Sequence, residues 1–308
     1  MNEVQRGDVN MPLLYLAKVN LNSKIFDVYD KKLKIKDVCD KIYNKIQAGS
    51  DYMTTHEDKY NDSLGNTLSY TKKSKYTFQE IEKRENGIIT GKLVRSFNKP
   101  TEKLDEITGK MVVTYNEENV SIYFYYDIYR EMITFCERQT FGYNQFMEAF
   151  TYLLNECVGV YEFQIFLQKD KNVLEEKMKA LKTVHKVNAT LIPPNSNEDD
   201  MNDLRELVYM QQCIDTNSTK IRLEYASDNM KMESNVMKDI MTAVSRGYGD
   251  MTASGINSEG LKCIVRSSHD AAYTSNIAEN ITKEDINTES EKLITRFLSK
   301  IANKLFAG

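Results

Sequence analysis

One segment near the middle of the chain, Glu131–Gly159, constrains the fold more than any other. In its first part, residues 131–138, successive side chains alternate between two faces with the period of two that defines a β-strand. Gly142 follows and permits backbone angles that other residues avoid, so it predicts a tight turn. Asn144 belongs to the residue types that commonly cap the start of a helix. A strand, a turn and the start of a helix are therefore predicted in direct succession.

The helix predicted at residues 144–157 has one broad apolar face. Its apolar side chains recur at helical spacing, at Phe146, Phe150, Leu153, Leu154 and Cys157. Gly159 is placed to end this helix. We expect the strand–turn–helix unit to form a shared wall for the strands upstream and the α/β segments downstream. The unit is structural and by itself indicates no function.

Upstream of this unit, the sequence predicts an antiparallel β-meander. A first strand is expected at 12–21, and a lysine-rich amphipathic helix at 30–48. The polar, aperiodic stretch 50–66 is interpreted as a loop. Asn86 and Gly87 separate two strand-like runs and indicate a hairpin. Further strands, with turns at 98–109 and 116–119, are expected at 67–83, 88–97, 111–115, 119–127 and 131–138.

Downstream, strands and helices alternate. Strands are expected at 161–168, 185–192, 220–226 and 261–267. Helices are expected at 173–182, 198–213, 230–246 and 288–306, and the glycine-bearing stretch 246–260 is interpreted as a turn. The fold class is therefore α+β, with an N-terminal antiparallel β-meander followed by an alternating strand and helix region. We expect a β-rich domain at 1–158, closed by the helix 144–157, and an α+β domain at 159–308 with a basic C-terminal helix.

Charge and composition narrow the class of protein. The net charge of the 308 residues is −4, but residues 1–110 carry +4 and residues 111–308 carry −8. An acidic total argues against a protein that coats nucleic acid and still permits a local basic surface. No run approaches 18 apolar residues, and the N-terminus lacks the regions of a signal peptide, so a cytoplasmic location is expected. The five cysteines lack metal-ligand or redox spacing, which favours free thiols in a reducing compartment.

Signatures of catalysis are absent from the sequence. None of the three histidines lies at metal-ligand spacing from a cysteine or carboxylate, and neither a nucleophile elbow nor a P-loop is present. The most catalytic-looking cluster, Arg266, His269 and Asp270, follows a predicted strand and is more simply a polar loop. We therefore expect no enzyme activity, no catalytic residue, no metal site and no cofactor.

Three sets of cations could meet phosphate groups. In the last helix, Lys292, Arg296, Lys300 and Lys304 recur every four residues and form one stripe. A second set consists of Lys220 and Arg222 on one side of a strand, with Lys231, Lys238 and Arg246 on the helix that follows. The third, at 31–45, is partly neutralised by its own aspartates. The alternative for each set is an ordinary solvated helix face. The residues predicted to bind DNA are Lys220, Arg222, Lys231, Lys238, Lys292, Arg296, Lys300 and Lys304.

The order of motifs from about residue 130 to 308 resembles that of RexA-type phage-exclusion proteins. A strand ending in a charged residue leads into T-F-G-Y-N and a helix carrying Phe146 and Phe150. The stretch HKVNATLIPPNSNEDDMNDL is similar to that group's strand, proline-containing turn and helix. RGYGDMTASGINSEGLKCIVRS is similar to its late glycine-rich turn and strand. Tyr143 stands where the group typically has proline, and no catalytic signature is shared.

The resemblance implies an intracellular defence protein that forms a homodimer and binds double-stranded DNA without reading its sequence. It also implies a membrane-protein effector as a partner. Two functions remain open on the residues alone. One is non-enzymatic DNA binding through Lys and Arg contacts to phosphate. The other is a protein-interaction scaffold whose acidic C-terminal half binds a partner, and a nuclease is a distant third.

Overall fold

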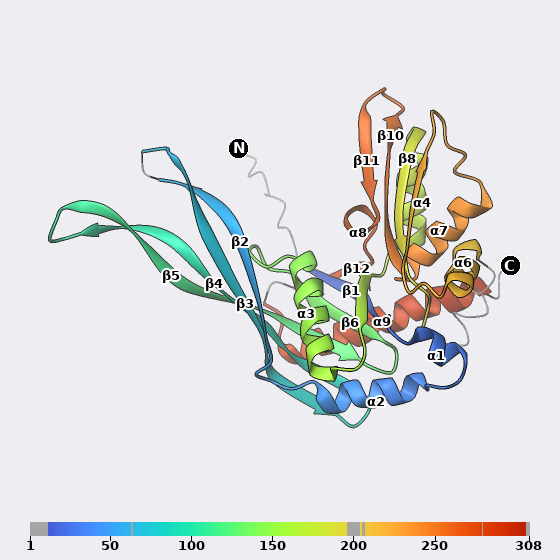
Figure 1. Cartoon of the computed structure of the whole chain (residues 1–308), viewed down its shortest axis with the longest axis horizontal. Coiled ribbons are helices and arrows are strands. Elements are labelled where there is room, and N and C mark those ends of the chain that lie inside the picture. The colour runs from blue at the N-terminus through green and yellow to red at the C-terminus, as the bar shows by residue number, and fades with distance from the viewer. Residues whose placement is uncertain (1–11, 63, 196–203, 205–206, 279, 306–308) are drawn as a thin grey trace, which may run out of the picture.

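The computed structural model describes residues 12–62, 64–195, 204, 207–278 and 280–305, with side chains up to residue 301. Its strands form two antiparallel sheets (Figure 1). The large sheet has the order β12-β1-β6-β5-β4-β3-β2, and β7 also pairs with β1. Its strands are β1 (Leu13–Leu21), β2 (Asp51–Asn61), β3 (Thr67–Arg84), β4 (Ile88–Asp105), β5 (Lys110–Asp127), β6 (Met132–Cys136), β7 (Phe163–Leu167) and β12 (Thr274–Asn276).

The small sheet has the order β11-β10-β8-β9. Its strands are β8 (Leu181–Leu191), β9 (Ile221–Ala226), β10 (Gly249–Asn257) and β11 (Lys262–Arg266). The helices are α1 (Ile25–Tyr29), α2 (Ile35–Lys45), α3 (Tyr143–Val158), α4 (Lys171–Lys179), α6 (Val208–Thr216), α7 (Asn235–Ser245), α8 (Ser267–Asp270) and α9 (Lys283–Leu305). The predicted α+β class, with an N-terminal meander and a region of alternating strands and helices, is confirmed.

The predicted central unit is present. The Phe146 ring on α3 stacks on Phe135 of β6 with a centroid separation of 3.9 Å. Phe150 meets the rings of two further strands, at 5.0 Å and 5.1 Å. The helix ends at Gly159, as expected, with a φ of 73°. Its N-cap is Gly142 and not Asn144, because the helix already begins at Tyr143.

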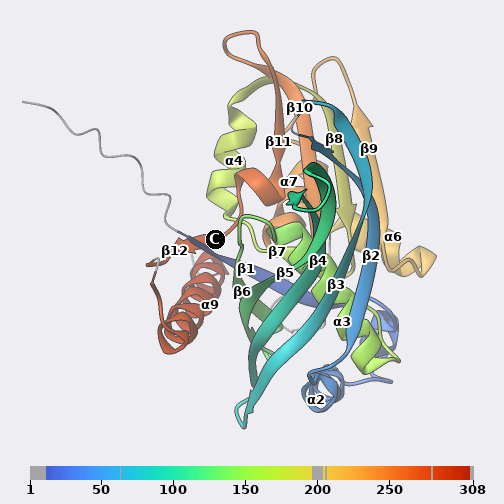
Figure 2. The ribbon, with the colours of Figure 1, turned by 90° about the vertical axis from the view of Figure 1, so that its left-hand side faces the viewer.

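The other face of the large sheet is covered by α9. Leu293, Ile294 and Phe297 pack there against Leu14 and Leu16 of β1. Figure 2 shows α9 and α4 on the same side of the molecule, while α2 and α3 lie on the opposite face of the large sheet. Strand β1 is therefore buried on both faces, which explains its almost continuous run of apolar residues.

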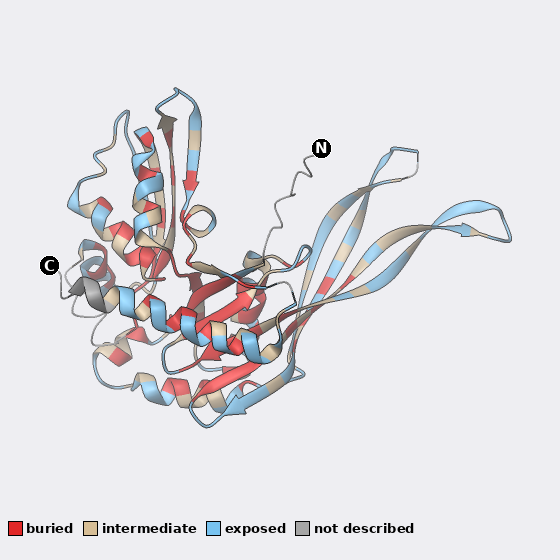
Figure 3. Cartoon of the chain, turned by 180° about the vertical axis from the view of Figure 1, so that it is seen from behind, coloured by how far each residue is buried: buried red, intermediate tan, exposed pale blue. Residues whose placement is uncertain are grey.

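Strands β2, β3, β4 and β5 extend well beyond the body as two prongs (Figure 1). The stretch 50–66, predicted to be a loop, contains β2, and the expected breaks at 98–109 and 116–119 lie largely within β4 and β5. Both faces of each prong are mostly exposed (Figure 3). The loop prediction was wrong because β2 carries polar residues on both faces. It therefore lacks the alternation of apolar and polar residues by which a strand is recognised. The predicted hairpin between β3 and β4 is present, and Gly87 takes a φ of 83° in its turn.

The glycine-bearing stretch predicted as a turn is largely the central strand β10. An added Cβ at Gly255 would lie 2.0 Å from the carbonyl oxygen of Thr183 on β8, and one at Gly249 would lie 2.1 Å from that of Thr190. Both glycines therefore permit close approach of the β8 and β10 backbones, Gly255 beside a register shift, and do not mark a turn.

Elements from the second half of the chain return to the large sheet. Strands β7 and β12 pair with β1, and α9 packs on the same sheet. The small sheet is built from residues 181–266. The large sheet thus contains strands from both sides of residue 158, and the division into domains 1–158 and 159–308 stays a prediction. Half of the helix expected at 198–213 lies outside the described residues, and its end, from Val208, belongs to α6.

Candidate functional site

The predicted basic stripe lies on the solvent side of α9. Lys292, Arg296 and Lys300 are exposed, while the apolar residues between them are buried against β1. Two buried or half-buried hydrogen bonds fix the helix on the sheet: Thr134 donates to Ser290 across 2.6 Å, and Tyr123 donates to Asn287 across 2.9 Å. The side chain of Lys304 lies outside the described residues.

A cavity of about 320 Å³ lies where α9 meets the start of α4 and the end of α7. Tyr273 and Phe297 contribute aromatic surface, with their ring centroids 4.9 Å apart. Three cations from three different elements line it: Lys171, Arg246 and Lys300. The stripe on α9 therefore continues into a hollow with cations on several sides.

Asp170 is the carboxylate of this cavity. It caps α4 by accepting hydrogen bonds from the backbone N–H groups of Asn172 and Val173, and it accepts one from Lys300 across 2.9 Å. Burial raises the pKa of Asp170, but the hydrogen bond and charge of Lys300 and the helix N–H groups outweigh burial and leave that pKa below its ordinary value. Asp170 is thus an ionised positioning group for Lys300.

Lys169 also lines the cavity, but its charge is neutralised. Its buried Nζ lies 2.6 Å from Asp250 and donates to the carbonyl oxygen of Gly249 across 2.7 Å. Burial lowers the pKa of Lys169, and the carboxylate of Asp250 acts in the opposite direction. Lys169 is therefore not part of the surface that can contact an external anion. The remaining cations, Lys171, Arg246, Lys292, Arg296 and Lys300, are named the α9 basic surface.

The other predicted DNA-binding residues lie elsewhere. Arg222 on β9 is in register with Thr190 of β8, which alternates with residues buried beneath α7. Arg222 therefore points to the face of the small sheet opposite the helices, and exposed Lys220 immediately precedes that strand. Lys231 and Lys238 are exposed on the helix side. The structure brings the cations of α9 together with Arg246 around one cavity. It adds Lys171 to this surface, because α4 packs near α9, a contact that the sequence pattern does not show.

The cluster at 31–45 is a separate solvated surface at α2. Lys32 pairs with Asp30 across 2.7 Å with both side chains exposed, and the Lys41 Nζ lies 5.2 Å from the ring centroid of Tyr161. These contacts do not join the α9 basic surface. The helix predicted at 30–48 is present but shorter, as α2 at Ile35–Lys45, and the separate short helix α1 was not predicted.

Arg266, His269 and Asp270 are brought together at α8. The His269 Nδ1 lies 2.8 Å from Asp270, which also accepts a hydrogen bond from the backbone N–H of Arg266 across 2.6 Å. The hydroxyl groups of Ser267 and Ser268 bind Asp250 and not the imidazole. The contacts of this cluster therefore stabilise a strand-to-helix turn.

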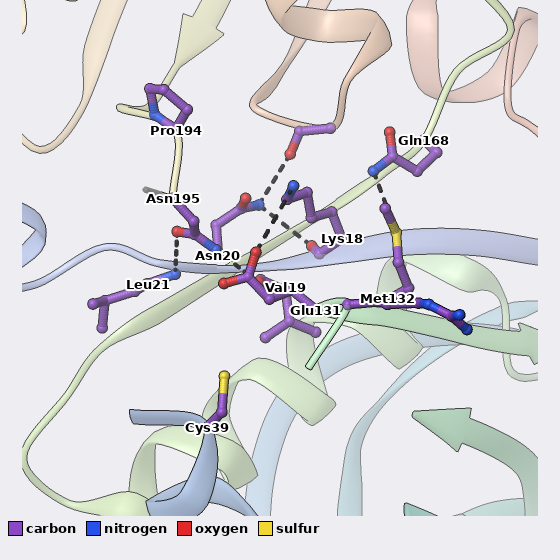
Figure 4. Close-up of polar contacts among 12 residues, drawn as sticks. Lys18, Val19, Asn20, Leu21, Cys39, Glu131, Met132, Gln168, Pro194 and Asn195 are labelled. Carbon is purple, nitrogen blue, oxygen red and sulfur yellow. Dashed lines mark hydrogen bonds and ion pairs between the residues drawn. The ribbon is translucent and has the colours of Figure 1, made fainter. Parts of the chain in front are cut away.

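A buried polar junction lies where the two sheets meet at β1 (Figure 4). Lys18 is 3% exposed and lies 3.8 Å from Glu131. Asn20 donates to the carbonyl oxygen of Gly247 across 3.0 Å and thereby joins β1 to the turn after α7. The side-chain carbonyl oxygens of Asn20 and Gln168 are buried and have no hydrogen-bond partner among the residues that the structure describes. The junction is a structural connection that positions α7, and with it Arg246, relative to the large sheet.

Two features are absent from the part of the chain that the structure describes. In that part, no three His, Cys, Asp or Glu side chains form a group that could hold a metal ion. Within the same residues, no helix has the length and apolar character needed to cross a bilayer.

The fold and the site together define a mixed α+β protein with a cationic surface on a helix that covers its large sheet. Residues 45–296 match the family described as "Domain of unknown function (DUF4747)", and the chain belongs to this family. The matched region includes both prongs, the small sheet and most of the α9 basic surface. No curated protein matches the sequence.

Proposed function

We propose that this protein binds duplex DNA without reading its sequence, as a cytoplasmic phage-defence protein that acts as a homodimer beside a membrane-protein effector. The observation that carries the DNA-binding part is the cavity in which cations of α4, α7 and α9 continue the stripe on α9. The defence role rests on the resemblance to RexA-type proteins alone.

The spacing of the α9 basic surface suits a phosphate backbone. Lys292 and Lys300 are eight residues apart, which corresponds to about 12 Å along a helix. Phosphates of one DNA strand follow at about 3.4 Å along the duplex axis, so this span covers about three or four of them. The cavity next to Lys300 could bind one further anionic group.

Existing ion pairs do not prevent such binding. Lys292 pairs with Glu289 across 2.8 Å, and Lys300 pairs with Asp170 across 2.9 Å, in each case with a half-exposed or exposed lysine. Exposed pairs of this kind contribute about 0–1 kcal/mol, which a phosphate contact can replace. Lysine and arginine contacts to phosphate supply affinity and carry no sequence information.

The test is a salt series with unrelated duplexes and a matched pair of variants. Binding should fall steeply with salt, with a log–log slope of about −4 to −8 for a dimer, because each neutralised phosphate releases counterions. Arg296→Glu should weaken the binding of every duplex alike. Arg222→Glu makes the same charge change on the face of the small sheet that the helices do not cover, and it should leave binding unchanged. Failure to shift any duplex at low salt, or equal effects of the two variants, would overturn this assignment.

A second candidate function, protein interaction, is favoured by the tip of the β4–β5 prong. There, the cross-strand pairs Leu104–Met111, Glu102–Val113 and Pro100–Tyr115 share one face of a two-stranded hairpin. Leu104 is 60% exposed and Met111 is 53% exposed. Two strands alone are marginally stable in water, and exposed apolar faces are typical of protein interfaces.

A second copy of the chain suits this face best. The tip at residues 99–110 carries three lysines and three carboxylates, so it favours neither a strongly acidic nor a strongly basic partner. Light scattering should then give twice the chain mass. Met111→Lys should produce monomers, while Val112→Lys, on the other face of the same strand, should not. A monomeric wild type, or dimers unaffected by Met111→Lys, would exclude this interface.

A further inference from the structure

A second pocket, of about 450 Å³, lies between α4 and α7. Its floor consists of Met178, Leu181, Val184 and Met241, all buried. The connection between β9 and α7 borders the pocket and is held by a hydrogen bond from the backbone N–H of Met230 to the carbonyl oxygen of Val184 across 3.0 Å. The pocket is therefore an apolar hollow with an ordered wall and not a gap between loops.

Four of the side chains that line this pocket are methionines: Met178, Met230, Met232 and Met241. Methionine is unbranched and has several rotatable bonds, so methionine-lined surfaces adapt to flexible apolar ligands. The volume lies within the range of about 300–1,000 Å³ that small-molecule sites occupy. The methionine lining thus favours a flexible, unbranched aliphatic chain over a rigid ring system.

The remaining lining side chains are mostly cationic. Lys171, Lys179, Lys182 and Lys238 face two carboxylates, Glu175 and Glu233. Two lysines have a carboxylate nearby, Lys171 at 4.0 Å and Lys238 at 3.9 Å, which are long separations for ion pairs. Lys179 and Lys182 are exposed and have no ion pair or side-chain hydrogen bond with any residue that the structure describes. The rim therefore has an excess of positive charge beside an apolar floor.

We propose that this pocket binds a linear anionic amphiphile, a long-chain carboxylate whose aliphatic chain lies on the methionine floor and whose head group lies at Lys179 and Lys182. The site is separate from the proposed DNA contact, because it shares with the cavity at α9 only Lys171. No bond is made or broken in this binding.

The experiment is calorimetric titration of the full chain with sodium decanoate below its critical micelle concentration. Each buried methylene contributes enough to change affinity about four-fold, so octanoate should bind about fifteen-fold more weakly than decanoate. Decanol has the chain without the charge and should bind more weakly than decanoate, and inorganic phosphate should not bind here. Equal affinity for octanoate and decanoate, or for decanol and decanoate, would overturn the proposal.

Variants place the ligand within the pocket. The double variant Lys179→Glu and Lys182→Glu should reduce decanoate affinity at least ten-fold, whereas Lys103→Glu and Lys110→Glu, the same charge change on the prong, should not. Met232→Asp, at the half-buried rim, should reduce affinity without lowering the melting temperature by more than a few degrees. Unchanged affinity in the Lys179/Lys182 variant would contradict the assignment.

An anionic lipid bilayer also combines aliphatic chains with negative head groups, so a separate experiment must distinguish it from a free amphiphile. Sedimentation with phosphatidylglycerol vesicles separates a free amphiphile from a membrane surface. Saturable decanoate binding at one site per chain, without sedimentation, supports the proposal. Sedimentation with vesicles without binding of free decanoate would assign these lysines to a membrane surface and overturn the pocket as the site.

Discussion

Lys300 on the last helix donates a hydrogen bond across 2.9 Å to Asp170, the N-cap of α4, although 130 positions separate the two residues. The contact joins the helix that covers the large sheet to the first helix of the small-sheet region. It also fixes one cation at the edge of the α9 cavity. Asp170 thereby stabilises a local helix terminus and a long-range contact at the same time.

These two roles can be separated by substitution. Asp170→Ala removes the cap and the pair, and we expect a loss of about 1–2 kcal/mol in the free energy of unfolding from urea denaturation. Asp170→Asn keeps a side-chain oxygen for the helix N–H groups, so it should lose less than half as much. Equal losses in the two variants would show that the helix cap contributes little.

The pH dependence of stability should report the same contact. Because the pKa of Asp170 is lowered in the folded protein, its contribution is present above the unfolded value, near 3.8, and is lost as the pH falls through the folded pKa. Lys300→Met removes the partner, so wild type should be more stable than the variant at pH 7. This difference should shrink between pH 4 and pH 2. A constant difference in urea melts over that range would contradict the ionic role.

The core prediction concerns α3. Phe146 and Phe150 are fully buried and contact rings from β3, β5 and β6. Either substitution to alanine should lower the free energy of unfolding by about 3–5 kcal/mol. Glu156→Ala, exposed on the same helix, should change it by less than about 0.5 kcal/mol. A loss below about 1 kcal/mol for Phe150→Ala in denaturant melts would show that this helix does not carry the core.

Three cysteines should be chemically inert in the folded state. Burial raises the pKa of Cys39 and Cys136 to about 12 and that of Cys213 to about 11. At pH 8 their thiolate fractions are on the order of 10⁻⁴ to 10⁻³, and the thiolate is the reactive form. Peptide mass spectrometry after iodoacetamide treatment should find these three unmodified in native protein and alkylated in urea. Rapid native labelling of Cys39 would contradict its burial.

Sequence patterns predicted the elements whose environment is asymmetric. The helix 144–157 was recognisable because only one of its faces is apolar, and Gly159 ends it through a conformation that glycine favours. The amphipathic α9 was recognisable for the same reason. Its basic residues were identified, but Lys171 was not, because that residue joins the surface through the packing of α4 against α9.

Elements with uniform surroundings were missed. Strand β2 has polar residues on both sides because both sides face solvent or the neighbouring prong, so its alternation is weak. Strand β10 was not recognised because it contains Gly249 and Gly255. These positions need glycine because the backbone of β8 lies close to them, and not because of their neighbours along the chain. The separation of Lys220 and Arg222 from the α9 cations likewise depends on sheet register, which no local pattern specifies.

Strand β1 also sets the order in which the chain can finish folding. It precedes all three of the strands with which it pairs: β6, then β7, and finally β12, which begins at Thr274. At translation rates of about 5–20 residues per second, its last partner leaves the ribosome on the order of 10–50 s after β1 does. During that interval β1 lacks this partner at one edge. A chain that stops before β12 therefore leaves β1 incompletely paired, because this long-range contact forms only after Thr274 has been added.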